Sequence, residues 1–501
     1  MFMDKLQRII FIPVAILLAS FFYACDDGFE NYSSNPNHLL SFSRDTIVFD
    51  TIISTINTPF QTFKVYNRNS KALLISAVSL ENGNESGFKI NVDGRAGDSF
   101  ENIEIRGNDS LFVFVDARPP KMNSNEPEYL TDYIVFTTNG VRQKVLLEAA
   151  AQDAEIWRGL VIHSDTILSN EKPFVIFDSL LIKEGATLHL QEGTTFYMHS
   201  GSEIIVQGNL KAKGTLEKPI VIRGDRFGYM VGISYDLIPG QWEGFRFEST
   251  SFDNELEYMR IRNGKNAMNF QLSDPERLKA KMKNVVMTNF KGTLINSVNC
   301  YIEAENCEFT NSQGALLNLI GGKYSFIHCT IANYYFSSSE LGWGSSSNQT
   351  VALSNRYFNN ETNEVEFYPI IQADFYNTII WGSQFRTTSQ FSLRESEESS
   401  IEYFLKNCLF PHLNASNDDE NDPNNIPRVV NCIINEDPKF RIIMSENPQK
   451  LEFIYDFRLN STSPARDRAD VRAAEKVPYD INGISRFLDG KPDMGGYEWK
   501  E

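Results

Sequence analysis

Apolar residues between Leu180 and Gly224 come in short groups, and glycines separate one group from the next. Breaks of this kind fall at residues 185, 193, 201, 208 and 214. A helix interior would lose about 1 kcal/mol at each such glycine relative to alanine. The pattern therefore predicts short β-strands joined by tight turns.

A second regularity follows downstream, where similar phrases (MRIRN, VVMTN, CEFTN and CTIAN) each end in asparagine. These asparagines are Asn263, Asn289, Asn311 and Asn333, and they lie 26, 22 and 22 residues apart. A period in this range indicates stacked coils. Each coil can hold three short strands and three turns, with successive coils about 4.8 Å apart around one continuous core. We expect the turn asparagines to bond the backbone of neighbouring coils.

Several phrases in this region resemble one protein family. They are Gly185-Ala-Thr-Leu, Glu192-Gly-Thr, Val206-x-Gly-x-Leu-x-Ala-x-Gly-Thr215, Pro219-Ile-Val-Ile and Trp242-Glu-Gly-Phe. Together they resemble the opening coils of secreted bacterial right-handed parallel β-helix proteins of the pectate-lyase-like superfamily. The resemblance covers residues 156–500 and implies an all-β solenoid over residues 155–501. It specifies the fold far better than any activity.

The end of the chain resembles the closing segment of many such proteins, which carries an Asp-x-x-Gly-x-x-Arg phrase and a Gly-Tyr-Glu. The matching residues are Asp480, Gly483, Arg486, Asp493, Gly496 and Glu498. Arg466 and Arg468 depart from the family pattern, where an apolar residue and an alanine are more usual. We interpret the charged residues as a buried Asp-Arg pairing that seals the end of the coils, and not as catalytic groups.

From about residue 40 to residue 153 the pattern changes to longer alternating strands. Seven or eight strands in this stretch match the size and rhythm of an immunoglobulin-like β-sandwich. The stretch lacks the cysteine and tryptophan of antibody domains, so its core must be aliphatic and Phe-based. We therefore expect residues 40–154 to form a sandwich that acts as a spacer or docking module.

The first 24 residues have the pattern of a secretory signal peptide: Lys5 and Arg8 precede a short apolar run that Pro13 interrupts. Cys25 follows Tyr23-Ala24 and resembles the acylated cysteine of bacterial lipoproteins, although Phe22 and Tyr23 depart from the usual residues. An ordinary signal peptide with an incidental Cys25 is the alternative. The polar residues 25–39 read as a tether to the membrane. The resemblance implies an outer-membrane lipoprotein of the cell envelope, on its periplasmic or cell-surface face.

The net charge of −18 narrows the possible partners. An acidic chain without a basic cluster does not fit nucleic acid or the capture of polyanions. If this protein binds a polysaccharide, we expect aromatic and hydrogen-bonding contacts. An envelope protein is another candidate partner.

Five cysteines remain after Cys25: Cys300, Cys307, Cys329, Cys408 and Cys432. Their odd number and spacing argue against a disulfide framework and against a zinc cluster. Small buried core residues are the favoured interpretation. A disulfide between neighbouring coils stays open, with Cys300 and Cys307, or Cys307 and Cys329, as the first candidates.

Catalysis on polysaccharides makes demands that the sequence does not visibly meet. A lyase needs acids that hold calcium and a basic residue that takes a proton, and a hydrolase needs two facing carboxylates. Neither set appears in the repeats, so we predict no catalytic residue, no metal and no cofactor. Residues 334–370 exceed the needs of a coil, and long insertions are usually functional. Tyr334, Tyr335 and Trp343 in this insertion are candidates for stacking on sugar rings.

The sequence as a whole predicts a lipid-anchored β-helix protein of the cell envelope that acts as a binding or scaffold module, with a glycan as the candidate ligand. A polysaccharide lyase or glycoside hydrolase with its site on the β-helix face is one alternative. A purely structural surface stalk is another.

Overall fold

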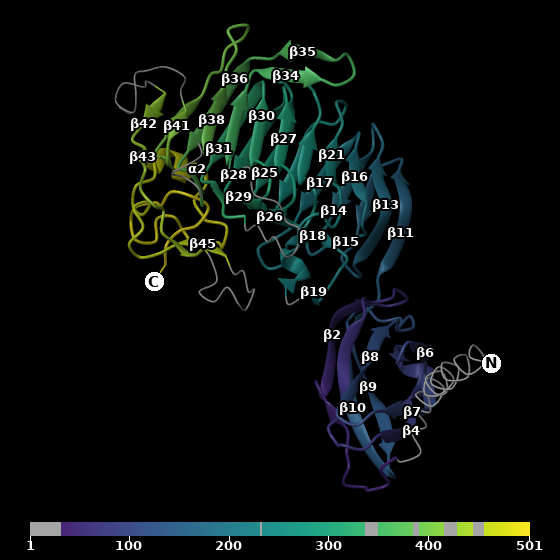
Figure 1. The fold of residues 1–501 in the computed structure, drawn as a ribbon. Coiled ribbons are helices and arrows are strands. Elements are labelled where there is room, and N and C mark those ends of the chain that lie inside the picture. The colour runs from purple at the N-terminus through teal and green to yellow at the C-terminus, as the bar shows by residue number, and fades with distance from the viewer. Residues whose placement is uncertain are drawn as a thin grey trace, which may run out of the picture. The chain divides into compact units, whose positions relative to one another are not determined.

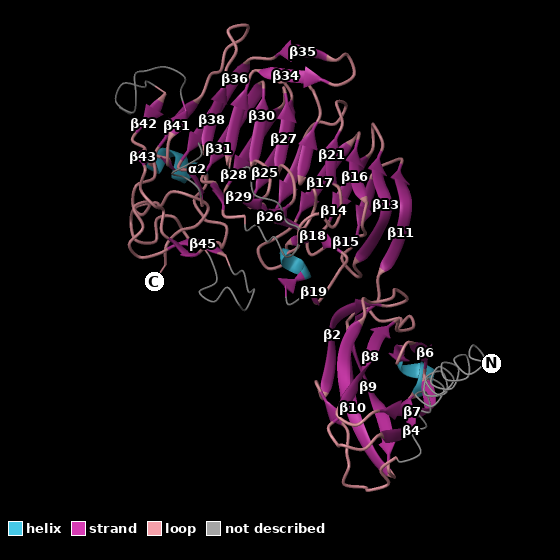
Figure 2. Ribbon diagram, in the orientation of Figure 1, coloured by secondary structure: helices cyan, strands magenta, loops and turns pink. Residues whose placement is uncertain are grey.

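The computed structural model describes residues 32–230, 233–335, 349–383, 390–414, 428–443 and 455–500. Almost all regular structure is β, and the chain divides into two compact units, residues 1–152 and 153–501 (Figures 1 and 2). Within the described residues, no helix is both long enough and apolar enough to cross a bilayer.

The first unit consists of two five-stranded sheets whose inward side chains form one core. Its strands are, in sheet order, β1 (Ser41–Phe42), β3 (Gln61–Asn67), β8 (Asp109–Ala117), β5 (Phe88–Val92) and β6 (Arg95–Gly97), and in the second sheet β2 (Thr46–Ile53), β10 (Val141–Gln152), β9 (Glu128–Thr138), β4 (Leu73–Leu80) and β7 (Ser99–Ile105). A 3₁₀ turn, η1 (Gly83–Ser86), joins β4 to β5. The first segment contributes β1 to one sheet and β2 to the other, where β2 pairs in parallel with β10. The two sheets around one core form a β-sandwich, which is the architecture expected of an immunoglobulin-like module.

The second unit is a parallel β-helix, which confirms the predicted fold class. One side is a ten-stranded parallel sheet: β12 (Thr166–Leu168), β14 (Thr187–Leu190), β17 (Asn209–Lys213), β22 (Asn254–Glu257), β25 (Leu278–Lys283), β28 (Tyr301–Glu305), β31 (Gly322–Ile327), β36 (Ile370–Tyr376), β39 (Phe404–Lys406) and β42 (Val429–Val430).

Most of the remaining strands form a nineteen-stranded sheet with two rows. Row 1 follows the ten-stranded sheet in each coil: β15 (Thr195–Met198), β18 (Ile220–Gly224), β23 (Met259–Arg262), β26 (Val286–Phe290), β29 (Glu308–Ser312), β32 (Thr330–Asn333), β37 (Ile379–Gly382), β40 (Leu409–Phe410) and β43 (Ile433–Ile434). Row 2 comes next: β16 (Glu203–Val206), β21 (Gly244–Phe247), β24 (Met268–Phe270), β27 (Ile295–Val298), β30 (Leu317–Ile320), β33 (Val351–Ser354), β38 (Phe391–Arg394) and β41 (Leu413–Asn414). Strands β11 (Glu155–Ile162) and β13 (Phe174–Ile182) run through both rows.

The interior of the coils is a continuous apolar core in which like residues stack from coil to coil. Phe247 and Phe270 stack with ring centroids 4.6 Å apart, and Phe326 and Phe375 stack at 5.0 Å. Each pair occupies matching positions in neighbouring coils, because the strands pair in register. Stacking of this kind explains how a long chain shares one core without becoming globular.

Two corners of the coil turn on residues with positive φ. The asparagines at the phrase ends do so between rows 1 and 2, where Asn263, Asn289 and Asn311 have φ of 70°, 62° and 53°. A second column lies between the ten-stranded sheet and row 1: Tyr258, Asn284, Asn306, His328, Asn377, Asn407 and Asn431, all with φ between 48° and 58°. Asparagine tolerates this left-handed conformation better than most residues, because its side chain can bond the local backbone.

Smaller elements decorate the coils: β19 (Tyr229–Met230), β20 (Ile233–Ser234) and η2 (Tyr235–Leu237) after row 1, and the hairpin of β34 (Arg356–Asn359) and β35 (Glu364–Phe367) after row 2. The chain ends in β44 (Phe440–Ile442), β45 (Asp456–Leu459), α2 (Val471–Lys476) and loops. We call residues 440–500 the closing segment.

Candidate functional site

Outward side chains of row 2 form a polar lane along the solenoid. Register places Arg246, Asn269, Asn296 and Asn318 in one column on four successive coils. The Asn296 side-chain amide donates to the side-chain oxygen of Asn269 at 2.9 Å, and the Asn318 amide donates to that of Asn296 at 2.7 Å. All three asparagines are half-buried. They present a row of amides at the spacing of the coils, about 4.8 Å.

Arg246 closes one end of this lane and holds two carboxylates. Its guanidinium donates to both oxygens of Glu203, at 3.0 and 3.1 Å, and also to Glu248. Glu203 stands on the neighbouring coil, while Glu248 directly follows the strand that carries Arg246. The hydrogen bonds that Arg246 donates to the Glu203 carboxylate are the main cause of its raised pKa. The three residues therefore form a charged network on the outer surface.

Gly244 explains part of the Trp-Glu-Gly-Phe phrase that precedes Arg246. Its φ is 117°, and a Cβ at this position would lie 1.9 Å from the Asn266 carbonyl oxygen. Only glycine lets the next coil approach so closely. The phrase thus fixes the start of β21 and the position of Arg246 on the lane.

An open hollow of about 650 Å³ lies outside the first coils, and its lining includes His189, Lys211, Lys213 and Lys218. Lys211 and Lys213 both pair with Glu255, at 2.8 and 2.6 Å, and Lys218 pairs with Glu192 at 3.3 Å. Hydrogen bonds from Lys211 and Lys213 lower the pKa of Glu255 to about 2. Because these lysines are already paired, the hollow is poorly suited to capture an anion by charge.

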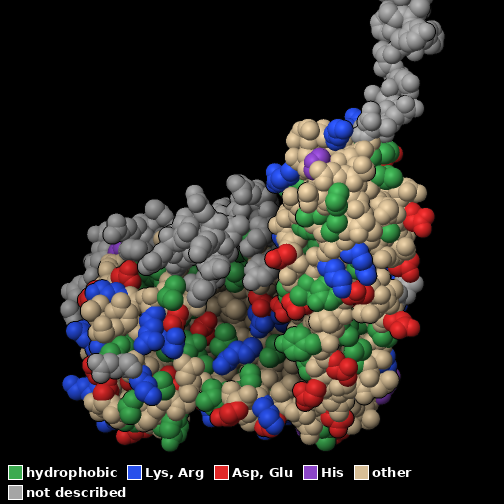
Figure 3. All heavy atoms as spheres, turned by 90° about the horizontal axis from the view of Figure 1, so that it is seen from below, with side chains coloured by type: hydrophobic (Ala, Val, Ile, Leu, Met, Phe, Trp, Pro, Cys, Tyr) green, Lys and Arg blue, Asp and Glu red, His purple; other side chains and the backbone are tan. Residues whose placement is uncertain are grey.

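Surface charges are mixed elsewhere as well. Acidic and basic side chains lie interspersed on the face that Figure 3 shows. On the ten-stranded sheet, Lys281 pairs with Glu303 and Glu305 across neighbouring strands. Such pairs neutralise one another and contribute little individually to stability.

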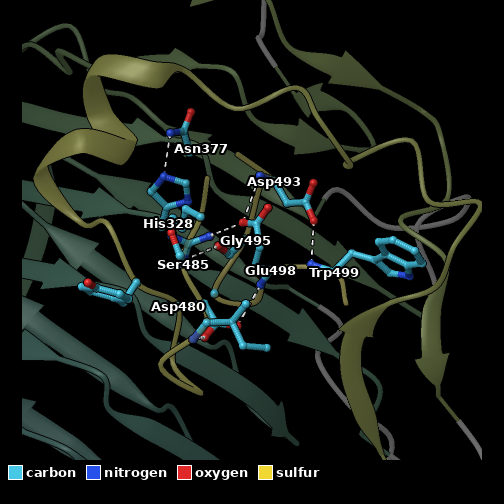
Figure 4. Close-up of polar contacts among 12 residues, drawn as sticks. His328, Asn377, Asp480, Ser485, Asp493, Gly495, Glu498 and Trp499 are labelled. Carbon is cyan, nitrogen blue, oxygen red and sulfur yellow. Dashed lines mark hydrogen bonds and ion pairs between the residues drawn. The ribbon is translucent and has the colours of Figure 1, made fainter. Parts of the chain in front are cut away.

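Three buried carboxyl groups of the closing segment have raised pKa values (Figure 4). Nη1 of Arg486 lies 3.4 Å from Oε2 of Glu498, and both side chains are fully buried. Burial first, and then the charge of Asp493, raise the pKa of Glu498 to about 9, while burial raises the pKa of Asp493 to about 6. An ion pair at this distance would favour an ionised Glu498, yet the burial of three carboxyl groups around one guanidinium outweighs it. The cluster therefore retains a proton at neutral pH.

Hydrogen bonds indicate where that proton resides. Asp480 accepts from the backbone amides of Asn482, Ile484 and Glu498, and Asp493 accepts from those of Asp467 and Trp499. The Asp493 amide, at 3.2 Å, and the Arg486 guanidinium, at 3.4 Å, both donate to Oε2 of Glu498, whereas its Oε1 is buried without a hydrogen-bond partner. Glu498 is therefore the neutral member, and the two aspartates accept backbone amides in the turns of the closing segment.

This cluster is closed to solvent, so it does not have the access that a substrate needs. It also corrects one expectation, because the Arg486 pairing does not seal the end of the last coil. Arg486 donates to the Asn306 side-chain oxygen at 2.6 Å, in the middle of the solenoid. Gly496 donates its amide to Thr330, and Asn377 exchanges two hydrogen bonds with the backbone of Asp470.

The closing segment instead covers the outer face of row 1. That face becomes apolar from β32 onward, where Ala332, Ile379, Trp381 and Leu409 are buried against residues of the closing segment such as Phe457. An apolar outer face must be covered, which is the physical reason for the return of the chain. The signal was present in the run TIIWG, because a strand without polar alternation is buried on both faces.

His328 lies in the same corner column and is buried beneath the closing segment. Its Nε2 accepts from the Asn377 amide at 2.8 Å. Burial and the nearby Arg486 keep its pKa well below the ordinary value, so the ring is neutral. It replaces asparagine in the column as a structural residue.

The structure describes two of the three residues predicted to bind sugar, Tyr334 and Tyr335. Tyr334 packs with Phe440 and Phe457, with ring centroids 6.2 and 6.0 Å away, and its carbonyl accepts from the Tyr455 hydroxyl. Tyr335 is half-buried beside it. Trp343 and Cys25 lie outside the described residues. Sequence reasoning did not identify the lane of Asn269, Asn296 and Asn318, although the phrases MNF, INS and LNL carried it at one position per coil.

Within the described ranges, no cluster of three or more His, Cys, Asp or Glu side chains could bind a metal ion.

No family model matches the sequence, and no curated protein matches it. Among solved structures, a family 123 glycoside hydrolase from Clostridium perfringens aligns at 13% identity and a TM-score of 0.16, over 23% of this chain and 26% of that one. The alignment thus spans about a quarter of that protein. The catalytic domain of a GH87 alpha-1,3-glucanase in complex with nigerose aligns at 9% identity and a TM-score of 0.18, over 75% of this chain and 88% of that one. Both neighbours are glycoside hydrolases, and similarity at this level carries no inference about activity.

Proposed function

We propose that this chain is a lipid-anchored protein of the cell envelope whose β-helix binds a glycan along the polar lane of row 2. The observation that carries the proposal is the column of hydrogen-bonded amides at Asn269, Asn296 and Asn318. Amides both donate and accept, so they suit the hydroxyl groups of a sugar.

The spacing of the lane supports a chain-like ligand. Successive amides are separated by one coil, about 4.8 Å, which is close to the length of one hexopyranose residue in an extended polysaccharide. A bound glycan chain would then run parallel to the lane, along the axis of the solenoid. Hydrogen bonds of this kind also fit a protein whose net charge is −18 and in which surface lysines such as Lys211 and Lys281 are paired with glutamates.

A glycan array followed by titration tests this proposal. Asn296→Ala removes the middle amide, and we expect about tenfold weaker binding of any glycan that the wild type captures. Ser325→Ala, at a half-buried residue of the ten-stranded sheet outside the lane, is the matched control and should bind as the wild type does. Melting temperatures of both variants separate lost binding from lost stability. An array without a captured glycan would instead favour the structural stalk.

A glycoside hydrolase is the second candidate, and one observation favours it. Glu203 and Glu248 share the guanidinium of Arg246 at the end of the lane, which brings together two carboxylates that the sequence did not show as a pair. Retaining and inverting hydrolases both need such a pair. New reducing ends from any polysaccharide in a panel, abolished in Glu203→Gln and in Glu248→Gln, would replace the binding role by catalysis. New absorbance at about 235 nm would instead indicate a lyase. Substitution of basic residues would then identify the one that takes the proton.

A further inference from the structure

Cys408 and Cys432 occupy the same position in the last two coils. Each follows a corner asparagine, Asn407 or Asn431, and both asparagines have φ of 51°. The strands on either side pair in register, Lys406 with Val430 and Leu409 with Ile433. The two cysteines are therefore direct neighbours across parallel strands.

Their separation matches the reach of a disulfide. Neighbouring parallel strands lie about 4.8 Å apart, within the range of about 4.4 to 6.8 Å for the Cα atoms of bonded cysteines. The Cys408 backbone amide donates to the Cys432 sulfur at 3.4 Å, and the two thiols contact each other. Both are thiols in this structure. A covalent bond between them requires little movement of the backbone.

Access distinguishes this pair from a second one. Cys307 and Cys329 are stacked in the same corner of consecutive coils, but both are completely buried. Gly496 of the closing segment lies against the Cys307 carbonyl and donates its amide to Thr330. Cys432 is only partly buried and belongs to the last coil. An oxidant can therefore reach Cys432 but not Cys307 or Cys329.

We propose that Cys408 and Cys432 form a disulfide that fastens the last coil of the β-helix, while Cys300, Cys307 and Cys329 remain thiols. This assignment replaces the pairs that the sequence favoured. Its occurrence in cells rests on the proposed export to the envelope, because disulfides persist in oxidising compartments.

The reaction is a thiol–disulfide exchange with a disulfide donor. The Cys432 thiolate attacks the donor, forms a mixed disulfide and releases one donor thiolate. The hydrogen bond from Cys408 lowers the pKa of Cys432 and favours this first attack. The Cys408 thiol then loses its proton, attacks the Cys432 sulfur and displaces the second donor thiolate. Two protein thiols are oxidised and the donor disulfide is reduced to two thiols.

The bond would act where the solenoid is weakest. Strands β42 and β43 end their sheets, so among the described residues the last coil has a neighbouring coil on one side only. Terminal units of a stack open first because they make fewer contacts. A cross-link from Cys432 to Cys408 restricts that opening.

Peptide mapping of the full chain tests the proposal. Protein from the envelope is blocked with N-ethylmaleimide, denatured and digested with trypsin without reduction. We expect peptides 407–428 and 429–439 to be joined, because trypsin cuts after Lys406, Arg428 and Lys439. Cys300, Cys307 and Cys329 should react with maleimide only after denaturation.

The purified native chain is also treated with oxidised glutathione. This treatment tests whether the disulfide can form, independently of whether the protein is exported in cells. Joined peptides after this treatment, but not from cells, would support the bond and count against export. If Cys408 and Cys432 are both found modified by maleimide after glutathione treatment, the inference is overturned. In the melting curve, dithiothreitol should lower the transition of the oxidised wild type and leave Cys432→Ser unchanged. Equal sensitivity of the two proteins to dithiothreitol would also contradict it.

Discussion

Glu498 shows how a single buried carboxyl group can tie folding to pH. Its pKa is about 9 in the folded protein, against an ordinary value of 4.5. Between these values the folded chain keeps a proton that the unfolded chain releases. The contribution to stability is therefore complete below about pH 4.5 and is lost as pH rises through about 9.

Replacement of Glu498 by glutamine should remove this dependence, because glutamine imitates the neutral carboxyl group at every pH. We expect the free energy of unfolding of the wild type to fall between pH 6 and 9, by at most about 1.4 kcal/mol per pH unit. In Glu498→Gln the slope should be smaller by that amount. Denaturant melts at several pH values measure both slopes. Glu276→Gln, at an exposed side chain, is the control, and an unchanged slope in Glu498→Gln would refute the assignment of the proton.

At the scale of elements, the fold depends on how the closing segment docks on the corner column. Three asparagines of this column differ in their hydrogen bonds. Asn377 makes two with the backbone of Asp470 and one with His328, and Asn407 makes one with the Arg468 carbonyl. Asn431 is exposed. All three share the left-handed backbone conformation. The three positions therefore share the same backbone conformation and differ in the number of hydrogen bonds that the side chain makes to other residues.

Alanine substitutions should follow this order. Asn431→Ala measures the cost of placing alanine in the left-handed conformation, about 1 to 2 kcal/mol. Asn377→Ala should cost about 2 to 3 kcal/mol more, because it leaves the half-buried backbone groups of Asp470 and the buried ring of His328 without these partners. Asn407→Ala should lie between the two. Unfolding free energies measure the series, and equal losses at the three positions would show that the segment does not depend on these bonds.

At the scale of the whole molecule, the chain consists of two units with separate cores, residues 1–152 and 153–501. The described part of the first unit is tied down from Ser33, whose amide donates to the Ala72 carbonyl at 2.9 Å. Only a short stretch separates this point from Cys25. A lipid on Cys25 would therefore hold the sandwich within about 28 Å of the bilayer, at most about 3.5 Å per residue.

Acylation of Cys25 is the prediction that belongs to this scale. Metabolic labelling with a clickable fatty acid should mark the wild type and fail to mark Cys25→Ala. The unlabelled variant should move from the membrane fraction to the soluble fraction, because one substitution removes the anchor. Cys432→Ser serves as the control for labelling at another cysteine. Equal labelling of Cys25→Ala and the wild type would exclude the lipoprotein assignment.

The sequence by itself determined the repeating architecture. Glycines, turn asparagines and short apolar groups are local signals, because each coil repeats the same strand and turn requirements. The phrases ending in Asn263, Asn289 and Asn311 thus predicted a corner that the structure contains, and the alternating strands before residue 153 predicted the sandwich. Recurrent local patterns need no knowledge of distant contacts.

Only the tertiary structure decided what lies on the outside of the coils. The lane of Asn269, Asn296 and Asn318 depends on register between coils, and the carboxylates Glu203 and Glu248 meet because Arg246 stands between them. The closing segment reaches Asn306 and Asn377 from far along the chain, and Cys408 stacks on Cys432 through pairing of parallel strands. Insertions of variable length separate the coils, so a recurring residue such as the lane asparagine becomes a neighbour of the next one only once the register between coils is known.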